Sequence, residues 1–485
     1  MSWFGNEADQ ISHAARGFAV MNSRNQAVFS NARPAGFARI NRASWIDTLR
    51  VVAAVMVPTA AKGIIIRRPI MERLAQRQGL DTGAVKQMQR LVKKYGRAPL
   101  LLPIPFRPQL LILDPVDVST VLQCSPQPFA TATREKRAAL AHFEPENVLI
   151  SDASQRAELR PIHEHALASA DRLHPSTARF KAIVDTELLE VLNGIGSDGR
   201  NELDWSAFSP AWFRIVRRIV LGDLARNDVT LTKTLNDLRS RANWAFAASI
   251  DRRKRRQFHQ QLGQYLRQPG EGSLIGRLPK GSDFGLESQV AQWLFAFDAA
   301  GIAIFRTLAL LACHPSYWAK AVDEAKDPEL DRPFTRNCLL EALRLWPTTP
   351  VILRELTEDI KTGDRTVARG TGVVIFAPFF HRDPELAYAN RMEPSIWGPN
   401  DALPAVGFVP FSAGAAICPA HNLVPTTASL AIGTLLSGTD VPLLQPSLTV
   451  DDLPGTLNHF DIRLRLSRQR VGASAPHAAA GFPPH

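Results

Sequence analysis

Hydrophobic residues recur every three to four positions through the middle of the chain, from about residue 153 to residue 346. This period places them on one face of a helix, whereas residues on one face of a strand recur every second position. The helices predicted for this region cover residues 156–168, 177–192, 210–221, 230–246, 253–266 and 287–313. Two earlier segments, 69–94 and 115–122, show the same helical pattern, so most of the chain is predicted to be helical.

Strand patterns are confined to short stretches on either side of this region. The segment 99–113 reads as two strands joined by a turn at 105–108. The strands expected after the helical region cover residues 351–357, 366–367 and 372–375. Because neither an internal repeat nor a linker divides the chain, we expect a mainly α fold with a minor β portion, formed by one domain over residues 46–468.

Both ends of the chain lack these periods. Residues 1–45 are rich in Asn, Arg, Ala and Gly, and residues 469–485 are small and contain prolines. We expect both ends to be poorly ordered. The first 45 residues contain no continuous apolar segment of the kind that a secretory signal has. With four cysteines and no CxxC pair, the chain is expected to be cytoplasmic, with reduced thiols.

Two apolar stretches have the appearance of membrane spans. Residues 51–66 are interrupted by Pro58 and Lys62 and fall short of the roughly 20 apolar residues that a spanning helix needs. Residues 294–312 are long enough, but they carry Asp298 and Arg306, which are costly within a bilayer. We therefore expect the first stretch to be buried or docked on the protein surface, the second to be a long helix inside the protein core, and no transmembrane anchor.

Composition and charge narrow the function only coarsely. The 485 residues are 45% apolar and 21% charged, which is typical of globular enzymes and excludes collagen, coiled coils and wholesale disorder. A net charge of +11 favours an acidic partner, an anionic surface or nucleic acid. The basic run at 252–256 lacks the interleaved aromatic residues that stack on bases, so we expect a solvated helix face and no nucleic-acid binding.

One cysteine stands out by its surroundings. Residues 407–423 read GFVPFSAGAAICPAHNL, a glycine-containing loop that places Cys418 just ahead of an apolar helix. A thiolate there could ligate a metal ion, although a single cysteine in isolation is more often a buried, inert residue. Phe411, Gly414, Cys418 and Ala420 resemble the cysteine-ligand loop of the cytochrome P450 family. The resemblance implies haem b as the cofactor, with the Cys418 thiolate as the axial ligand of its iron.

Further segments resemble the family in the same order along the chain. Glu341 and Arg344 match its ExxR helix motif, whose pair is structural, and residues 381–384 match its HRDP turn. Arg354 matches a basic residue that binds a haem propionate, and Arg156 and Arg160 match a helix that contacts the same carboxylates. Arg156 stands where the family has His or Trp. These residues, with Phe411 and Gly414, are the expected cofactor-binding positions.

The chain also departs from the family pattern. Ile396 stands where the family has the second Arg of the ExxR network, and Arg391 is a candidate to replace it. Ala416 stands where the family has a basic residue that contacts a propionate, so haem retention is expected to depend more on Arg160 and Arg354. Ala420 replaces the commoner Gly, which is a mild change.

The most consequential departure lies in the segment that resembles the oxygen-binding helix. Asp298 keeps the family's acid, but Ala299 replaces the Thr whose hydroxyl assists oxygen activation. The next hydroxyl, of Thr307, lies eight residues on, roughly 12 Å along the helix axis and about 80° around it. It is therefore not expected to substitute. Asp298 is expected to take part in proton delivery, the alternative being a paired core carboxylate.

The resemblance implies a monooxygenase that inserts one oxygen atom from O2 into a hydrophobic small molecule. Electrons are expected from a separate ferredoxin or flavodoxin with its reductase, since no cysteine cluster or flavin domain is fused to the chain. The residues expected to line the substrate pocket are Phe295, Ala296, Phe297, Ala300, Val351, Ile352 and Leu353. Two alternatives remain: a peroxide-driven peroxygenase, suggested by Ala299, and a non-catalytic haem-binding or sensor protein of the same fold.

Overall fold

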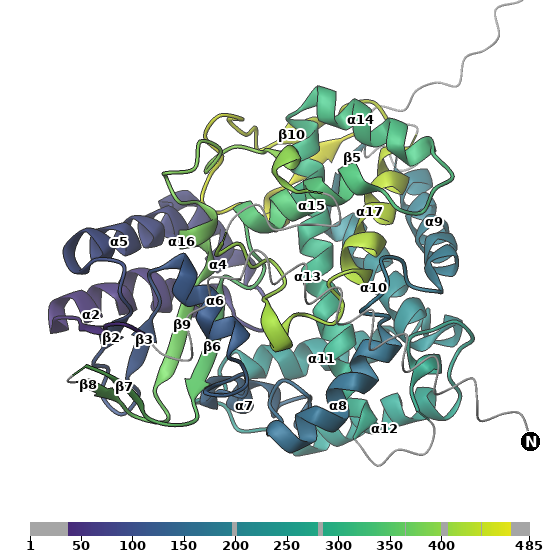
Figure 1. Ribbon diagram of the computed structural model, residues 1–485. Helices are drawn as coiled ribbons and strands as arrows, with labels where there is room; N and C mark the ends of the chain where they lie inside the picture. Colours follow the sequence, from purple (N-terminus) through teal and green to yellow (C-terminus); the bar gives the residue numbers. More distant parts are fainter. Residues whose placement is uncertain are drawn as a thin grey trace, which may run out of the picture.

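The computed structural model describes residues 37–195, 201–279, 285–363, 365–398, 406–437 and 439–466. Helices form most of this part of the chain, and a six-stranded sheet lies to one side of them (Figure 1). The expected tail at 469–485 and residues 1–36 of the expected N-terminal segment lie outside the described residues.

The first described residues already belong to the fold. Phe37 and Ile40 are buried, and β1 (Asn41–Arg42) pairs in parallel with β2 (Leu100–Leu102). Residues 37–45 therefore form part of the sheet side of the molecule, ahead of residue 46, at which we expect the domain to begin.

The N-terminal helices pack beside the sheet. They are α2 (Trp45–Val51), α3 (Val57–Lys62), α4 (Pro69–Gln78), α5 (Leu80–Tyr95), α6 (Pro115–Gln123) and α7 (Arg134–Leu140). The prediction of a single helix over 69–94 is wrong, because Gly79 adopts φ 60° and ends α4 with a hydrogen bond from its N–H to the Ala75 carbonyl. A glycine reaches this left-handed conformation without the steric cost that a Cβ brings. The apolar stretch at 51–66 is helical as far as Lys62. The Lys62 side chain is buried and paired with Asp81 at 2.6 Å.

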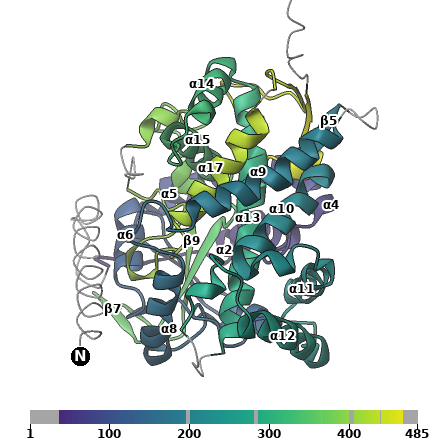
Figure 2. The ribbon, with the colours of Figure 1, turned by 90° about the vertical axis from the view of Figure 1, so that its right-hand side faces the viewer.

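The remaining helices form the larger part of the molecule. They are α8 (Ala153–Ala166), α9 (Thr177–Gly194), α10 (Trp205–Leu221), α11 (Val229–Ala242), α12 (Arg252–Arg267), α13 (Leu286–Ala312), α14 (Pro315–Lys326), α15 (Pro333–Leu345), α16 (Ala377–His381) and α17 (Leu423–Leu436). α13 packs against α10, α12, α15 and α17, and α9 packs against α10 and α17 (Figure 2). The basic run on α12 is a solvated face, since Arg252, Arg253 and Arg256 are exposed.

α13 is the central helix of the fold. Among the described residues it alone is long and apolar enough to cross a membrane, and 78% of its most apolar window is buried inside the protein. Arg306 lies buried on it and donates to the carbonyls of Leu457 and Trp346, both at 3.0 Å. The charge that a bilayer would disfavour is thus hydrogen-bonded inside the protein.

Three sheets complete the described structure. The largest has the order β1-β2-β3-β9-β6-β4, and its most extensive pairing, between β6 and β9, is antiparallel with Arg354 opposite Val373. The strands are β3 (Gln109–Leu111), β4 (Phe129–Ala130), β6 (Val351–Leu356) and β9 (Gly372–Phe376). The smaller sheets are formed by β5 (Glu202–Asp204), β10 (Leu443–Gln445) and β11 (Arg463–Arg465), and by β7 (Ile360–Thr362) and β8 (Arg365–Val367).

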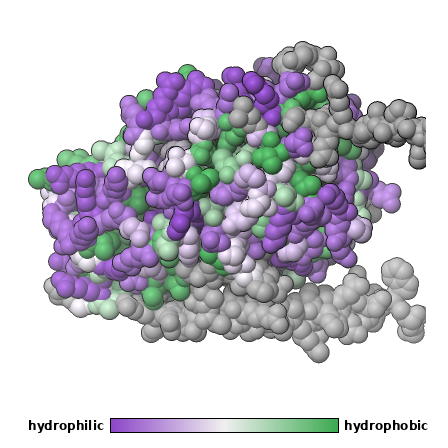
Figure 3. Space-filling view, turned by 90° about the horizontal axis from the view of Figure 1, so that it is seen from above, coloured by the Kyte–Doolittle hydropathy of each residue, from purple (hydrophilic) through white to green (hydrophobic). Residues whose placement is uncertain are grey.

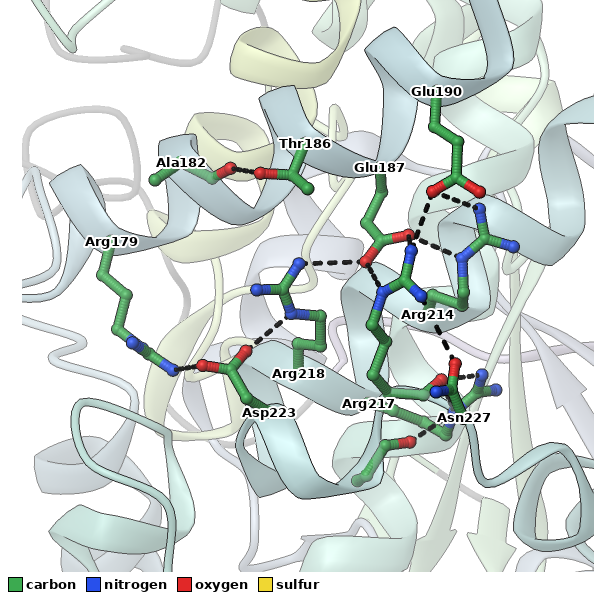
Figure 4. A network of polar contacts seen from close by, with 12 residues as sticks. Arg179, Ala182, Thr186, Glu187, Glu190, Arg214, Arg217, Arg218, Asp223 and Asn227 are labelled. Carbon is green, nitrogen blue, oxygen red and sulfur yellow. Dashed lines mark hydrogen bonds and ion pairs between the residues drawn. The ribbon is translucent and has the colours of Figure 1, made fainter. Parts of the chain in front are cut away.

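A buried acid joins α9 to α10. Glu187 of α9 is fully buried and pairs with Arg214 at 2.5 Å, Arg218 at 2.9 Å and Arg226 at 2.6 Å (Figure 4). Several cations around one carboxylate offset the cost of taking it out of water.

Polar side chains cover much of the remaining surface. Figure 3 shows one face, seen from above, on which hydrophilic positions predominate and hydrophobic ones gather towards the centre. Elsewhere, Trp244 and Phe246 are exposed after α11, and the Arg68 guanidinium lies 4.4 Å from the centre of the Trp244 ring. Asn243 accepts a hydrogen bond from the Ile65 N–H at 2.9 Å, so the segments before α4 and after α11 are held together.

Candidate functional site

The loop before α17 holds Cys418 in a conformation that depends on glycine. Gly414 has φ 64°, and a Cβ at this position would lie 2.3 Å from the Leu122 carbonyl oxygen. The Cys418 N–H donates to the Phe411 carbonyl at 2.9 Å, which closes the loop on itself. Gly414 of the sequence pattern and the backbone carbonyl of residue 411 therefore set the path of the backbone that carries the thiol.

The Cys418 thiol is suited to bind a metal as its one protein ligand. Burial raises the pKa of Cys418, while the Ala420 N–H and the Arg160 charge act in the opposite direction. A bound metal ion displaces the thiol proton. No group of three or more His, Cys, Asp or Glu among the described residues could hold a bare ion. An iron held mainly by a macrocycle fits this arrangement better than a metal held by side chains alone.

Two arginines of α8 reach the loop. Arg156 donates to the Ala415 carbonyl at 3.0 Å, and Arg160 donates to the Ile417 carbonyl at 2.7 Å. The helix begins with a capping box at Asp152, which fixes its first turn ahead of both arginines. Arg160 also pairs with Glu164 at 2.6 Å, so part of its charge is already balanced.

Arg354 reaches the same loop from β6. Its side chain is buried and donates to the hydroxyls of Ser412, at 3.2 Å, and Ser125, at 2.9 Å. Burial and the neighbouring Arg156 lower the pKa of Arg354 to about 10. Both effects reflect positive charge that is held away from water without a counter-charge.

Lys136 of α7 is a fourth cation at this site, which the sequence analysis missed. Its amine donates to the carbonyls of Thr131, at 3.0 Å, and Leu353, at 3.2 Å. Burial, and then the charges of Arg354 and Arg156, lower its pKa to about 7. In the sequence, the run REKR at 134–137 resembles a solvated helix face, and only the contact with Leu353 distinguishes this lysine.

These cations provide a test of whether haem fits. Among the described residues, Arg156, Arg354 and Lys136 have no ion pair with a carboxylate within 4.0 Å, and each donates to neutral oxygens only. Buried charges normally have an opposite charge nearby. Excess positive charge beside a thiol loop suits a cofactor that carries two carboxylates. The residues present therefore fit haem, with Cys418 as the iron ligand.

Asp298 of α13 is a paired carboxylate. It accepts a hydrogen bond from Arg239 of α11 at 2.5 Å. The buried Arg239 also donates to the Ile65 carbonyl at 2.9 Å and lies over the Phe295 ring at 4.8 Å. One arginine thus connects α13 with α11 and with the segment before α4.

The next hydroxyl along α13 does not replace the one missing at Ala299. Thr307 is buried and donates to the Ala303 carbonyl of its own helix at 2.8 Å. Its hydroxyl is therefore directed at the backbone one turn earlier. The side chain of Ala299 has no polar atom. Asp298 is therefore the polar side chain that α13 provides within residues 295–300.

The predicted pocket residues divide into two groups. Phe295, Ala296, Val351 and Leu353 are partly exposed, which suits residues that border an internal space. Ala300 and Ile352 are buried. Phe297 is buried against α10, where the Trp212 indole donates to its carbonyl at 2.8 Å. That the seven residues line a common pocket stays a prediction.

Glu341 and Arg344 form a fully buried, bidentate ion pair on α15. Arg344 Nε and Nη2 donate to Oε1 and Oε2 of Glu341 at 2.7 Å and 2.8 Å. Arg344 Nη1 and Nη2 also donate to the backbone carbonyls of His381, Tyr388, Ala389 and Arg391. This pair therefore anchors the chain from the HRDP turn to residue 391 onto α15.

The replacement for the second arginine is not the Arg391 side chain, contrary to our expectation. Its guanidinium is exposed and donates to the Ala387 carbonyl at 2.8 Å. Glu341 instead accepts from the Trp397 indole at 2.9 Å and from the Glu393 N–H at 2.7 Å. Two neutral donors thus stand in for the missing charge, next to the Ile396 position.

Comparison with known proteins gives a consistent result. Residues 207–445 match the family profile described as Cytochrome P450. Cytochrome P450 4c3 of Drosophila melanogaster is 28% identical over 176 residues, which are 32% of this chain and 32% of that protein. Cytochrome P450 4A24 of Sus scrofa is 26% identical over 212 residues, which are 40% and 42% of the two chains. The matched region thus spans less than half of the length of these curated relatives.

Solved structures extend the likeness to the whole fold. The heme domain of cytochrome P450DA superposes on 80% of this chain and 92% of its own, with a TM-score of 0.61 and 18% identity. Retinoic acid bound cyanobacterial CYP120A1 covers 79% and 94% of the two chains, with a TM-score of 0.62 and 18% identity. The predicted fold class, mainly helical with small sheets, is confirmed, and the chain belongs to the cytochrome P450 family.

Proposed function

We propose that the protein is a haem-thiolate monooxygenase that inserts one oxygen atom from O2 into a hydrophobic small molecule. The observation that carries this proposal is the glycine-dependent Cys418 loop, bordered by buried cations that lack a carboxylate partner. When bound, haem with a thiolate ligand supplies the chemistry that activates O2.

The side chains of this protein have separate roles in the proposed reaction. The Phe411–Gly414 turn holds the thiol in place, while Arg156 and Arg354 hold the cofactor through its carboxylates. Apolar side chains such as Phe295 exclude water from the space where the substrate binds. Holding the substrate against the reactive centre lowers the entropic cost of the reaction.

Asp298 is the group we propose to pass protons along α13. Its carboxylate is held by Arg239, so it can turn away from α11 only when this ion pair loosens. Since Arg239 also holds the Ile65 carbonyl, such loosening involves α11 and the segment before α4 together.

The electrons come from a separate ferredoxin or flavodoxin with its reductase, in our proposal. The net charge of +11 favours an acidic partner. The start of α8 has a mixed surface, however, with exposed Asp152 and Glu158 next to exposed Arg137. We further propose a cytoplasmic location, to which the four free cysteines are suited.

A peroxide-driven peroxygenase is the second candidate. Ala299 carries no hydroxyl, and Thr307 donates to its own helix, so neither side chain offers a hydroxyl that assists the use of O2. Peroxide brings oxygen that is already reduced, which makes this assistance less necessary.

Product formation under three conditions tests the function. Candidate hydrophobic compounds, first selected by a shift of the Soret band, are incubated with NAD(P)H and redox partners, with peroxide alone, or with neither. We expect product with redox partners. Product with peroxide alone indicates the peroxygenase, and a haem-loaded protein that converts no Soret-shifting compound in any condition contradicts both activities and favours the binding protein.

A further inference from the structure

The basic residues beside the Cys418 loop include one that the sequence motifs did not supply, Lys136 of α7. We propose that Lys136 binds a carboxylate of the haem in place of the basic side chain missing at Ala416, and that its amine takes up a proton when haem binds. This inference rests on the haem site of the proposed function, and it concerns how firmly the cofactor is held at different pH.

The position of the Lys136 amine is set by backbone carbonyls. It donates to the Leu353 carbonyl at 3.2 Å, and Arg354 donates to the same oxygen at 3.0 Å. Two cations that share one acceptor lie close together and repel each other. Because Arg354 is buried, water screens this repulsion poorly, and an anion between the two groups would relieve it.

In the described part of the chain, neither Lys136 nor Arg354 has an ion pair with a carboxylate. The charged groups that face the amine are Arg354 on β6, Arg156 on α8 and Glu135 on α7 itself. Glu135 accepts two hydrogen bonds from Arg107, at 2.6 Å and 2.7 Å, and is thus committed to another cation. α11 also packs on α7, but its Asp237 and Arg239 are paired with other charged side chains. Glu164, which acts on Arg156, is paired with Arg160, and Glu355 of β6 is paired with Arg107 at 2.7 Å. Among the described residues, none of the three cations therefore has an ion pair of its own with a carboxylate.

The positive charges around Lys136 in the haem-free protein predict that a proton is taken up when haem binds. Burial and the two arginines lower the pKa of Lys136 to about 7, so at pH 8 much of the amine is neutral. A carboxylate bound beside it favours the charged form and raises this pKa. Haem affinity is then greatest below pH 7 and falls as the pH rises through the haem-free pKa, by at most about tenfold for each pH unit.

Haem retention in the full-length chain tests this inference. Lys136→Met is compared with Arg134→Met, which removes an exposed charge from the same helix. The haem-loaded proteins are mixed with an excess of a haem-scavenging apoprotein at pH 6 and pH 9, and the rate of haem loss is followed. The urea midpoint of each haem-free protein is measured in parallel.

We expect Lys136→Met to lose haem about tenfold faster than wild type at pH 6, with a smaller difference at pH 9. Its haem-free form should be at least as stable as wild type, because a cation with cationic neighbours has been removed. Arg134→Met should match wild type in both assays. Unchanged haem retention, an unchanged pH dependence, or a loss of stability in the haem-free form alone would overturn the inference. Wild-type protein that binds no haem would instead refute the proposed haem site itself.

Discussion

The ion pair between Asp298 and Arg239 includes the carboxylate that we propose for proton transfer and also connects two helices. Their 2.5 Å contact lies in a region that excludes much of the solvent, and Arg239 is buried. Such a pair both holds α11 on α13 and restrains the carboxylate. A test of proton transfer by Asp298 therefore needs a separate measurement of how much the ion pair stabilises the protein.

Asp298→Asn is expected to lower the rate supported by redox partners by on the order of 100-fold, the usual contribution of a positioned acid or base. The rate supported by peroxide should change little, since peroxide already carries the protons. Turnover is measured with both oxidants, and haem content and thermal midpoint report the loss of the Arg239 ion pair. If both rates stay at the wild-type value, Asp298 does not deliver protons.

Glu341 shows how a missing arginine is replaced by neutral donors. Trp397→Phe removes the indole N–H from a buried carboxylate and should destabilise the haem-loaded protein by about 1 to 3 kcal/mol. Arg391→Ala, at an exposed side chain, should stay within about 0.5 kcal/mol of wild type. Urea unfolding of both variants checks this prediction. A larger loss for Arg391→Ala than for Trp397→Phe would contradict our assignment of the donors.

At the scale of elements, Glu187 joins α9 to α10 through charge. Burial alone would raise the pKa of Glu187, but hydrogen bonds from Arg226, Arg214 and Arg218 outweigh it and hold this pKa below its usual value (Figure 4). A carboxylate with a lowered folded pKa stabilises the protein above its unfolded pKa. This stabilisation is lost as the pH falls through the folded value.

Glu187→Gln should accordingly lower the free energy of unfolding by about 2 to 4 kcal/mol at pH 7, because it leaves three arginines around a neutral amide. The difference from wild type should shrink as the pH falls below the unfolded-state pKa of a glutamate, about 4.3, towards the lowered pKa of folded Glu187. Unfolding midpoints measured from pH 7 down to pH 3 test this. A difference that is constant over the range would show that the charge of Glu187 does not stabilise the fold.

Element prediction from the sequence succeeded where the pattern was local. The 27 residues of α13 form one helix over nearly the predicted range, because its apolar period is unbroken. β5 was missed, because three residues stabilised by pairing with β11, more than 250 positions away, leave no local period. The break at Gly79 lay in the sequence, but a glycine within a helical pattern is often tolerated, and only the contacts of α4 and α5 decide it.

At the scale of the whole molecule, the candidate site combines predicted and unpredicted residues. Cys418, Arg156, Arg160 and Arg354 were identified because the family motif has a fixed spacing, and the structure brings the three arginines to the loop that carries Cys418. Lys136 was not identified, because it meets Leu353 across 217 positions of sequence. A contact formed only by the fold has no signature in a single sequence.

The central claim is that Cys418 holds haem iron as a thiolate. The most direct measurement is the absorption spectrum of the reduced protein with carbon monoxide, for wild type and for Cys418→Ser at matched haem content. Wild type should show the red-shifted Soret band that is typical of thiolate ligation, and the variant should lose it. A fully haem-loaded wild-type protein with an unshifted band, or a variant that keeps the shifted band, would contradict the account.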